Sequence, residues 1–539
     1  MISWQKISYY LNFTHHYFMI SINNLNISIG ANTVVDNVSL QIRSGETLGL
    51  VGESGSGKSM TALTIMRLLP KVAKVNNGSI FFEQKELLSL TQKEMCDIRG
   101  KNIAMIFQEP MTALNPSLRC GHQVDEILKI HSNIKSKDTK AYTLERFAEV
   151  LMPNPEEAYN KYPHQLSGGQ LQRVMIAMVI SCKPQLLIAD EPTTALDVTV
   201  QREVLMLLKS LQRRYGMGML FVSHDLNVVS AICENIAVMQ HGKIVEQGAS
   251  KNILTNPQNF YTQHLISCRN SVAAEKQKSK TGKILDVKDL TATFITKKSL
   301  LGKPLKSFPA VNNISFELYK GETLGLVGES GSGKSTLGRS IMQLIDSKSE
   351  NIIFNGINVN HAKGNELKLL RKQMQLVFQD PYSSLNPRLS IGHAIEEPIA
   401  VHGIASGKEA RENALVLLKK VGLGSKYYSR FPHELSGGQR QRVVIARALA
   451  VNPQILICDE SFSALDVSIQ AQVLQLLNQM KKEFDLSYIF ISHDLAVVRQ
   501  MSDRIMVMQH GNLVEINTAD NLFENPQKEY TKRLIAAKF

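Results

Sequence analysis

The sequence predicts an α/β protein that contains two domains of one fold in tandem. Ten residues, LVGESGSGKS, occur identically at positions 50–59 and 326–335. In each half, strand-length apolar segments alternate with helical ones, which predicts a mostly parallel sheet with flanking helices. The segments NVSLQI and NISFEL alternate apolar and polar residues and predict a small antiparallel β-subdomain in each half. A polar, helix-rich insertion in each half predicts an additional helical subdomain.

The duplication extends far beyond this segment. Landmarks of the first half recur in the second in the same order and at nearly the same spacing, Lys58, Gln108, Ser167, Glu191 and His224 matching Lys334, Gln379, Ser436, Glu460 and His493. A period this long indicates two whole domains that were duplicated and fused. The polar, lysine-rich segment at 270–283 is a predicted linker between domain 1 at 19–269 and domain 2 at 284–539.

The repeated segment fits the pattern G-x-x-x-x-G-K-[ST], a loop whose backbone N–H groups and lysine surround a phosphate. In both halves it lies between an apolar strand and the start of a helix, where the helix dipole attracts anions. Each copy is therefore a candidate nucleotide-binding loop, or P-loop. The residues assigned to it are Gly52, Glu53, Ser54, Gly55, Ser56, Gly57, Lys58, Ser59 and Met60, and in the second half Gly328, Glu329, Ser330, Gly331, Ser332, Gly333, Lys334, Ser335 and Thr336.

Another strand of each half ends in a pair of carboxylates. The segments QLLIADEPTTALD and QILICDESFSALD place Asp190 and Asp459 at strand ends, where an aspartate suits a Mg²⁺ ligand. The adjacent Glu191 and Glu460 suit a general base or a group that positions water. Each half therefore has a candidate Mg²⁺ ligand next to a candidate catalytic glutamate.

A Ser-Gly-Gly turn opens a helix in each half, in LSGGQLQR and LSGGQRQR. Such a turn is usually only a helix cap, but it also presents a second anion-ready helix N-terminus. The segments FVSHD and FISHD end a further strand in His224 and His493, and a lone strand-end histidine is more often structural than catalytic. The turn residues are Ser167, Gly168, Gly169 and Gln170, and Ser436, Gly437, Gly438 and Gln439.

Composition limits the other functions. The chain has 539 residues and a formal net charge of +13, but its basic residues are dispersed without an arginine-rich tract. The charge therefore indicates a membrane surface or a phosphate-rich setting, and no nucleic-acid partner is expected. The six cysteines form no C-x-x-C pair, which favours a reducing compartment and indicates no zinc or iron–sulfur site. No apolar run is long enough to span a bilayer, and the first residues do not form a convincing signal peptide.

The whole set of motifs, in this order and twice over, resembles the ATP-binding cassette (ABC) family: P-loop, Q-loop glutamine, signature LSGGQ, Walker B, D-loop and switch histidine. The flanks IFQEPMTALNP and VFQDPYSSLNP, with NPQNFYTQHLI and NPQKEYTKRLI near the end of each half, look like the ATPases of peptide, nickel and glutathione importers. The fused arrangement is most similar to that of bacterial oligopeptide importers, including those for the peptide antibiotic microcin C. Met19 begins a segment that resembles the usual start of such cassettes, so residues 1–18 are either an upstream extension or a mis-assigned start.

The resemblance implies how the two halves cooperate. In the family, two cassettes pair head to tail, and each ATP is bound by the P-loop of one cassette and the signature of the other. Here the pairing would be intramolecular, and the cofactors would be ATP and Mg²⁺. The implied Mg²⁺ ligands, direct or through water, are Ser59, Gln108, Asp190, Ser335, Gln379 and Asp459. The implied catalytic residues are Glu191 and Glu460, which act on the attacking water, and His224 and His493, which contact the γ-phosphate.

The expected function is that of an ATPase subunit that energises a bacterial importer of oligopeptides or dipeptides. It would lie peripherally on the cytoplasmic face of the inner membrane, with two membrane permeases and a periplasmic or extracellular substrate-binding protein as partners. Nickel and glutathione are alternatives, because substrate choice lies in those partners. A tandem-cassette protein of ribosomes or nucleic acid is disfavoured by the short linker, and a sugar importer by the retention of every catalytic residue type in both halves.

Three departures from the family pattern distinguish the halves. The second Walker B reads DESFS, which lacks the usual proline and threonine after Glu460. Because Glu460 itself is present, this change predicts a loop of altered rigidity rather than a loss of catalysis. Leu171 stands where the second half keeps Arg440 after the signature. Phe294 occupies the place of an aromatic residue that stacks on adenine, whereas its counterpart Ile29 cannot stack. The sequence therefore predicts weaker ATP binding at the first site.

Overall fold

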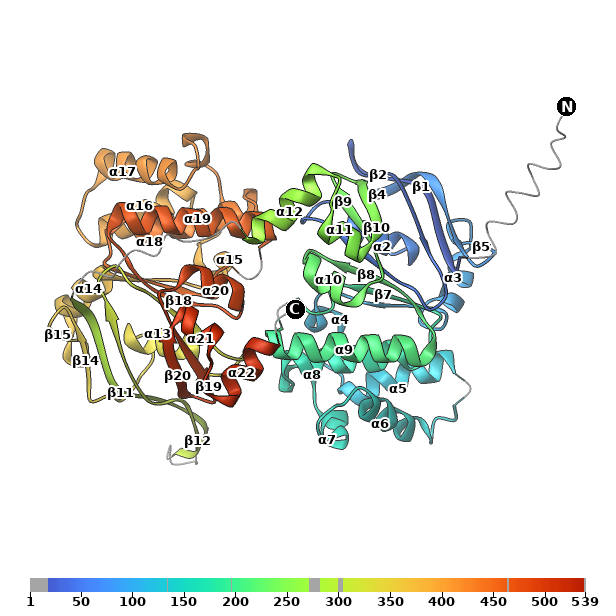
Figure 1. The fold of residues 1–539 in the computed structure, drawn as a ribbon, viewed down its shortest axis with the longest axis horizontal. Coiled ribbons are helices and arrows are strands. Elements are labelled where there is room, and N and C mark those ends of the chain that lie inside the picture. Colours follow the sequence, from blue (N-terminus) through green and yellow to red (C-terminus); the bar gives the residue numbers. More distant parts are fainter. Residues whose placement is uncertain are drawn as a thin grey trace. The chain divides into compact units, whose positions relative to one another are not determined.

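The computed structural model describes residues 18–132, 134–194, 196–270, 282–298, 304–462 and 465–537 (Figure 1). The chain divides into two compact units that correspond to the two halves of the duplicated sequence. Residues 1–17 of the predicted extension and residues 271–281 of the predicted linker lie outside the described part of the chain. Within the described part, no helix has the length and apolar character needed to cross a membrane.

A six-stranded, mostly parallel sheet forms the centre of the first unit, with strand order β10-β9-β3-β8-β7-β6. β3 pairs in parallel with β8 and β9, and β7 with β6 and β8, whereas β10 runs antiparallel to β9. β3 and β7 are buried along their whole length, as expected for apolar strands of a sheet covered on both faces. The strands are β3 (Thr47–Val51), β6 (Ile103–Ile106), β7 (Leu186–Asp190), β8 (Gly218–Ser223), β9 (Asn235–Gln240) and β10 (Lys243–Ala249).

A four-stranded antiparallel sheet, with order β2-β1-β4-β5, packs on one side of this sheet. A single hydrophobic core joins its strands to helix α2 and to the parallel strands. Because β3 leads directly into α2 inside this core, the P-loop between them is anchored at both ends. The elements are β1 (Ile20–Ile29), β2 (Asn32–Ile42), β4 (Ala73–Phe82), β5 (Lys85–Glu86) and α2 (Lys58–Ile65).

A second core joins the helices to the other face of the parallel sheet. The insertion predicted between Gln108 and Ser167 forms α4 to α7 and a short 3-10 helix at Pro163–Gln165. Besides α2, the α-helices of the first half are α3 (Gln92–Ile98), α4 (Pro110–Ala113), α5 (Cys120–His131), α6 (Thr139–Glu149), α7 (Pro155–Asn160), α8 (Gly168–Ile180), α9 (Val198–Tyr215), α10 (Leu226–Ile232), α11 (Ser250–Thr255) and α12 (Phe260–Asn270).

The second unit repeats this architecture, with sheet orders β12-β11-β14-β15 and β16-β17-β18-β13-β19-β20. The predicted fold is therefore confirmed in both halves. Its strands are β11 (Lys283–Lys298), β12 (Pro304–Tyr319), β13 (Thr323–Val327), β14 (Asn351–Phe354), β15 (Ile357–Asn358), β16 (Met374–Val377), β17 (Ile455–Asp459), β18 (Ser487–Ile491), β19 (Arg504–Gln509) and β20 (Asn512–Thr518). Its α-helices are α13 (Lys334–Ile341), α14 (Gly364–Gln373), α15 (Pro381–Ser384), α16 (Ile391–Val401), α17 (Gly407–Lys420), α18 (Gly437–Leu449), α19 (Val467–Phe484), α20 (Leu495–Met501), α21 (Ala519–Glu524) and α22 (Glu529–Ala536).

Candidate active sites

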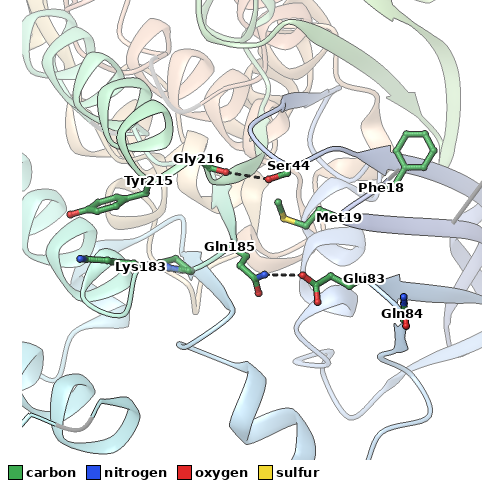
Figure 2. Close-up of a pocket in the computed structure, with 10 residues that line it drawn as sticks. Phe18, Met19, Ser44, Glu83, Gln84, Lys183, Gln185, Tyr215 and Gly216 are labelled. Atoms are coloured by element: carbon green, nitrogen blue, oxygen red, sulfur yellow. Dashed lines mark hydrogen bonds between the residues drawn. The ribbon is translucent and has the colours of Figure 1, made fainter. Parts of the chain in front are cut away.

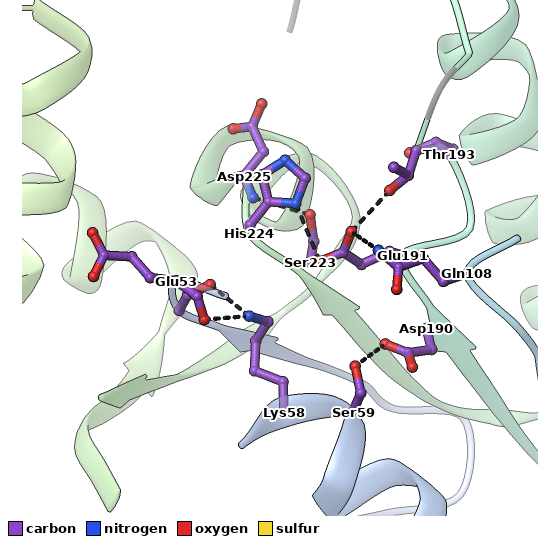
Figure 3. A network of polar contacts seen from close by, with 12 residues as sticks. Glu53, Lys58, Ser59, Gln108, Asp190, Glu191, Thr193, Ser223, His224 and Asp225 are labelled. Atoms are coloured by element: carbon purple, nitrogen blue, oxygen red, sulfur yellow. Dashed lines mark hydrogen bonds and ion pairs between the residues drawn. The ribbon is translucent and has the colours of Figure 1, made fainter. Parts of the chain in front are cut away.

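The P-loop of the first unit connects β3 to α2 and folds back on its own lysine (Figure 3). Gly57 caps α2 with a φ of 104°, a backbone conformation that requires glycine. Lys58 is 5% exposed, and its Nζ donates to the backbone oxygen of Gly52 at 2.7 Å and to that of Glu53 at 2.8 Å. The loop thus holds a buried cation at a helix N-terminus, where an anionic phosphate is favoured.

Asp190 ends β7 beside the start of α2 (Figure 3). Ser59 Oγ donates to Asp190 Oδ1 at 3.1 Å. Burial raises the pKa of Asp190 to about 6, although the hydrogen bond from Ser59 opposes this. A carboxylate and a hydroxyl are the hard oxygen ligands that Mg²⁺ prefers, so these two residues fit the predicted ion. The described residues include no group of three or more His, Cys, Asp or Glu side chains that could hold a metal, and Mg²⁺ sites of this kind take their other ligands from phosphate and water.

Glu191 is held by side chains from three different segments. Gln108 Nε2 donates to Glu191 Oε2 at 3.0 Å, Thr194 Oγ1 donates to the same oxygen at 2.9 Å, and His224 Nδ1 lies 3.2 Å from Oε1. Burial alone raises the pKa of Glu191, but the contacts with His224, Thr194 and Lys58 outweigh it, so the pKa lies below its ordinary value. The carboxylate is therefore ionised at neutral pH, the form that orients water or accepts a proton.

The second unit repeats the P-loop and Walker B geometry. Lys334 Nζ donates to the backbone oxygen of Gly328 at 2.8 Å and to that of Glu329 at 3.0 Å. Ser335 Oγ donates to Asp459 Oδ1 at 2.6 Å. Burial raises the pKa of Asp459, as it does for the matching aspartate of the first unit. The arrangement that could hold a nucleotide phosphate and Mg²⁺ is therefore present twice.

Glu460 has a related set of neighbours in the second unit. Gln379 Nε2 donates to Glu460 Oε2 at 3.0 Å, as its counterpart does in the first unit. Lys334 Nζ lies 3.5 Å from Oε1, whereas His493 Nδ1 lies 3.8 Å from Oε2, beyond hydrogen-bonding distance. Burial raises the pKa of Glu460, but the nearby His493 and Lys334 bring it below its ordinary value. The switch histidine is therefore closer to its glutamate in the first unit than in the second.

One charged neighbour of the second site was missed by the sequence analysis. Arg339 Nη2 lies 3.4 Å from Asp459 Oδ2. The arginine follows Ser335 by one helical turn in α13, and the matching position of α2 holds Leu63, which carries no charge. A basic residue at this spacing from the P-loop serine was the available signal. The Walker B carboxylate thus has a guanidinium neighbour in the second unit that the first unit does not offer at this position.

The signature turns form complete helix caps. Ser167 Oγ accepts from the backbone N–H of Gln170 at 3.4 Å, and Gln170 Oε1 accepts from the backbone N–H of Ser167 at 3.1 Å. The same two bonds join Ser436 and Gln439. The capping role that the sequence left open is therefore real, and Ser167 and Ser436 are still exposed to solvent. Their part in binding ATP stays a prediction.

The predicted adenine-stacking positions differ as the sequence indicates. Phe294 is 41% exposed on β11, and its cross-strand neighbour in the antiparallel pairing is Phe308, itself 51% exposed. Ile29 lies at the end of β1, and its cross-strand neighbour is Asn32. The second unit therefore presents two exposed aromatic rings where the first presents none. Phe308 was missed because only strand pairing places it beside Phe294.

The two other departures also have structural consequences. Phe462, after the second Walker B, is buried and stacks on Phe490 with ring centroids 5.8 Å apart. Arg440 lies over the ring of Tyr382 at 3.8 Å from its centroid and donates to the backbone oxygen of Pro432 at 2.6 Å. Leu171, its counterpart, is simply buried. The second unit thus ties its signature helix to the segment after the Q-loop by a cation–π contact.

A phosphate loop facing a strand-end pair of carboxylates, built twice on the same sheet topology, is the arrangement of a tandem cassette ATPase. The family model for ABC transporters matches residues 35–194 and 311–463, and that for the C-terminal region of oligopeptide/dipeptide transporters matches residues 245–292. The chain therefore belongs to the ABC transporter family, as an ATPase that binds and hydrolyses ATP.

Proteins similar to this chain include glutathione import ATP-binding proteins. The glutathione import ATP-binding protein GsiA of Pectobacterium atrosepticum is 43% identical over 93% of this chain and 86% of its own length. The protein of the same name from Escherichia coli K12 is 42% identical over 96% of this chain and 89% of its own length. Among solved structures, an ATP-binding cassette dimer in a post-hydrolysis state with ADP and Pi is 31% identical to this chain. The match covers 44% of this chain and 98% of the solved chain, with a TM-score of 0.39.

Burial of Asp190 predicts a stability effect with a defined pH dependence. Its folded-state pKa of about 6 lies above the ordinary value of 3.8, so the folded protein holds this proton more tightly than the unfolded chain. The ionised carboxylate therefore destabilises the fold above pH 6, by about 3 kcal/mol for a shift of this size, and the effect disappears as the pH falls toward 4. Asp190→Asn, which keeps an oxygen to accept from Ser59, is expected to unfold at a higher temperature than the parent protein at pH 7.5.

The measurement is thermal unfolding in chelator, without nucleotide, at pH 7.5 and pH 5. The gain from Asp190→Asn should shrink at the lower pH. Asp97→Asn is the matched control, because Asp97 lies exposed on α3. A gain that is equal at both pH values, or no gain at pH 7.5, would contradict the expectation.

Proposed function

We propose that this ATPase energises the import of glutathione or a chemically similar short peptide. The observation that carries the proposal is the 42–43% identity to glutathione import ATP-binding proteins over both cassettes. The oligopeptide/dipeptide match at residues 245–292 supports the same peptide-like class. Among the substrates that the sequence left open, these similarities favour glutathione over longer peptides, and neither similarity points to nickel.

In this proposal Lys58 and Lys334 bind the ATP phosphates, because each is a buried cation at a helix N-terminus. Glu191 and Glu460 position the attacking water and accept its proton. His224 is placed to keep the first of these glutamates oriented, since it lies within hydrogen-bonding distance of the carboxylate. In this proposal the ATP phosphates lie between the P-loop lysine, which carries a positive charge, and the glutamate that acts as the base.

The residues proposed to hold Mg²⁺ are Ser59 and Asp190 in the first cassette and Ser335 and Asp459 in the second. The Q-loop residues Gln108 and Gln379, proposed as further ligands, donate to the neighbouring Glu191 and Glu460. When bound, the ion neutralises charge that develops on the transferring phosphate. The exposed signature turns would add backbone N–H donors for the nucleotide, each to the site of the other cassette. Head-to-tail pairing within one chain remains part of the proposal.

We further propose two permeases and a substrate-binding protein as partners, with this chain bound peripherally at the cytoplasmic face of the membrane. The importer relatives and the membership in the transporter family support these partners. The domain boundaries at 19–269 and 284–539 belong to the same proposal.

Uptake of radiolabelled glutathione tests the substrate. The chain is co-expressed with its permeases and binding protein in cells that lack their own glutathione importer. The Glu191→Gln, Glu460→Gln double variant serves as the inactive control. We expect uptake above that of the control, and we expect unlabelled glutathione, but not a pentapeptide, to compete with it. Uptake of a labelled pentapeptide without uptake of glutathione would assign the chain to general oligopeptide import.

The two ATP sites are expected to differ in affinity. Stacking of a base on an aromatic ring is worth roughly 1–3 kcal/mol, and about 1.4 kcal/mol is a factor of ten in affinity. The first site, which offers Ile29 in place of Phe294, should therefore bind ATP about five- to a hundred-fold more weakly. Packing of the isoleucine on adenine offsets part of this difference and favours the lower end.

Each site is measured with the other P-loop lysine replaced, using Lys334→Ala for the first and Lys58→Ala for the second. Ile29→Tyr should tighten ATP binding at the first site, whereas Ile29→Val, which cannot stack, should not. Equal affinities at the two sites, or no effect of the added ring, would rule out the stacking difference.

A further inference from the structure

The tail motifs NPQNFYTQHLI and NPQKEYTKRLI, which mark each half in the sequence, lead in the structure to the P-loops. Tyr261 lies at the start of α12, and its hydroxyl oxygen accepts from the backbone N–H of Glu53 at 3.1 Å. Tyr530, in α22, accepts from the backbone N–H of Glu329 at 3.2 Å. Both tyrosines are buried. The same contact is therefore built twice, between segments more than two hundred residues apart in the sequence.

This contact acts on the peptide group that also binds the P-loop lysine. The N–H of Glu53 and the carbonyl of Gly52 belong to one peptide plane, and that carbonyl accepts from Lys58 Nζ at 2.7 Å. A peptide plane cannot turn its N–H without turning its carbonyl. The Tyr261 hydroxyl therefore fixes the orientation in which the carbonyl faces the ammonium group. In the second cassette, the Gly328 carbonyl accepts from the P-loop lysine at 2.8 Å in the same way.

The tyrosines are themselves held in place by a duplicated anchor. Glu246 on β10 accepts from the backbone N–H of Gln258 at 2.8 Å and of Asn259 at 3.2 Å, which fixes the turn before α12. Asn259 Oδ1 then accepts from the backbone N–H of Tyr261 at 2.8 Å.

In the second cassette, Glu515 on β20 accepts from the backbone N–H of Gln527 at 3.0 Å and of Lys528 at 3.1 Å. A strand carboxylate thus fixes the turn before the terminal helix in both units, and that helix carries the tyrosine. Burial raises the pKa of Tyr530 to about 12, so its hydroxyl stays neutral over the physiological range.

We propose that Tyr261 and Tyr530 are positioning residues for ATP binding, each setting the P-loop peptide that orients the phosphate-binding lysine of its own cassette. The tail motif of each half then contributes to ATP binding by holding the P-loop in place. The inference rests on the P-loops being the ATP sites, as proposed above. It adds a second layer to those sites that neither the P-loop pattern nor the carboxylate pair contains.

The test removes only the hydroxyl groups. Tyr261→Phe in the Lys334→Ala background, and Tyr530→Phe in the Lys58→Ala background, are compared in the full-length chain. Each should weaken ATP binding about 3- to 10-fold, the effect of losing one buried hydrogen bond. Adenosine, which has no phosphate for the P-loop to bind, is the second probe, and its affinity should stay unchanged. A purely structural role would lower the melting temperature without changing the ratio of ATP to adenosine affinity.

Two other buried tyrosines provide matched controls. The Tyr159 hydroxyl donates to Asp125 Oδ2 at 2.6 Å, and the Tyr488 hydroxyl donates to the backbone oxygen of Leu477 at 2.8 Å, so neither bonds to a P-loop. Tyr159→Phe and Tyr488→Phe should leave the affinity ratio unchanged. Unchanged ATP affinity in Tyr261→Phe and Tyr530→Phe, or an equal loss in the controls, would overturn the positioning role. If Lys58→Ala also leaves ATP binding at the first site intact, the proposed ATP site itself fails.

Discussion

Replacing both Glu191 and Glu460 by glutamine is expected to lower steady-state ATP hydrolysis by about 10²- to 10⁴-fold, because each site would lose its proposed general base. Glutamine has nearly the shape of glutamate, so the hydrogen bonds from Gln108 and Gln379 to the remaining carbonyl oxygen can persist. ATP binding, which depends on the P-loop, should change little. The double variant should therefore accumulate bound, uncleaved ATP.

Phosphate release and equilibrium ATP binding are measured on the same preparations. Each single variant is included, because one intact glutamate per chain shows whether one site can turn over alone. Glu156→Gln, on the exposed side of α7, is the matched control and should keep normal turnover. Near-normal hydrolysis by the double variant would remove both glutamates from the proposed chemistry.

A methyl group at the last P-loop glycine is expected to weaken ATP binding strongly at the cassette that carries it. Gly57 and Gly333 have φ values of 104° and 100°, where an L-residue is strained. A Cβ would also lie 2.7 Å from the Val34 carbonyl oxygen in the first cassette and 2.1 Å from the Ala310 carbonyl oxygen in the second. Strain and overlap with backbone atoms together cost about 3 kcal/mol or more in the observed loop conformation, so the free loop is expected to relax to another one. ATP binding must then restore the observed conformation, and the affinity should fall at least about 100-fold.

Gly57→Ala is measured with Lys334→Ala, and Gly333→Ala with Lys58→Ala, so that each site is observed alone. Gly45→Ala and Gly321→Ala are the matched controls, since both glycines have positive φ values of 73° and 72° but no atom within 4 Å of an added Cβ. These controls carry the backbone strain without the overlap and lie outside the P-loop. Normal ATP affinity in Gly57→Ala would show that the loop tolerates rearrangement there, against the expectation.

Much of the site was predictable because its motifs are local. The P-loop pattern fixes its own conformation, since glycines at set positions permit the turn that precedes Lys58 and Lys334. Apolar strands ending in Asp190 and Asp459 indicated where the carboxylates would lie, because the carboxyl ends of parallel strands meet at one edge of the sheet. The hydrogen bonds from Ser59 and Ser335 to these carboxylates follow from that placement.

Other features depend on residues that the sequence separates widely. The match between Phe294 and Phe308 required the strand register of β11 and β12, which the spacing of motifs does not give. Arg339 was visible as a charged residue on a helix, but its distance to Asp459 depends on how α13 packs against β17. The tail motifs were recognised as family markers, yet their contact with the P-loop was not predicted.

The sequence by itself determined the tandem α/β architecture, the P-loops and the positions of the paired carboxylates, because each is encoded by hydrophobic periodicity or by residues a few positions apart. Only the tertiary structure decided what surrounds them. It places Thr194 and His224 against Glu191, Arg339 near Asp459, and the Tyr261 hydroxyl at the backbone N–H of Glu53. The physical reason is that a hydrogen bond acts over about 3 Å, and side chains come within that distance only after sheets and helices have packed.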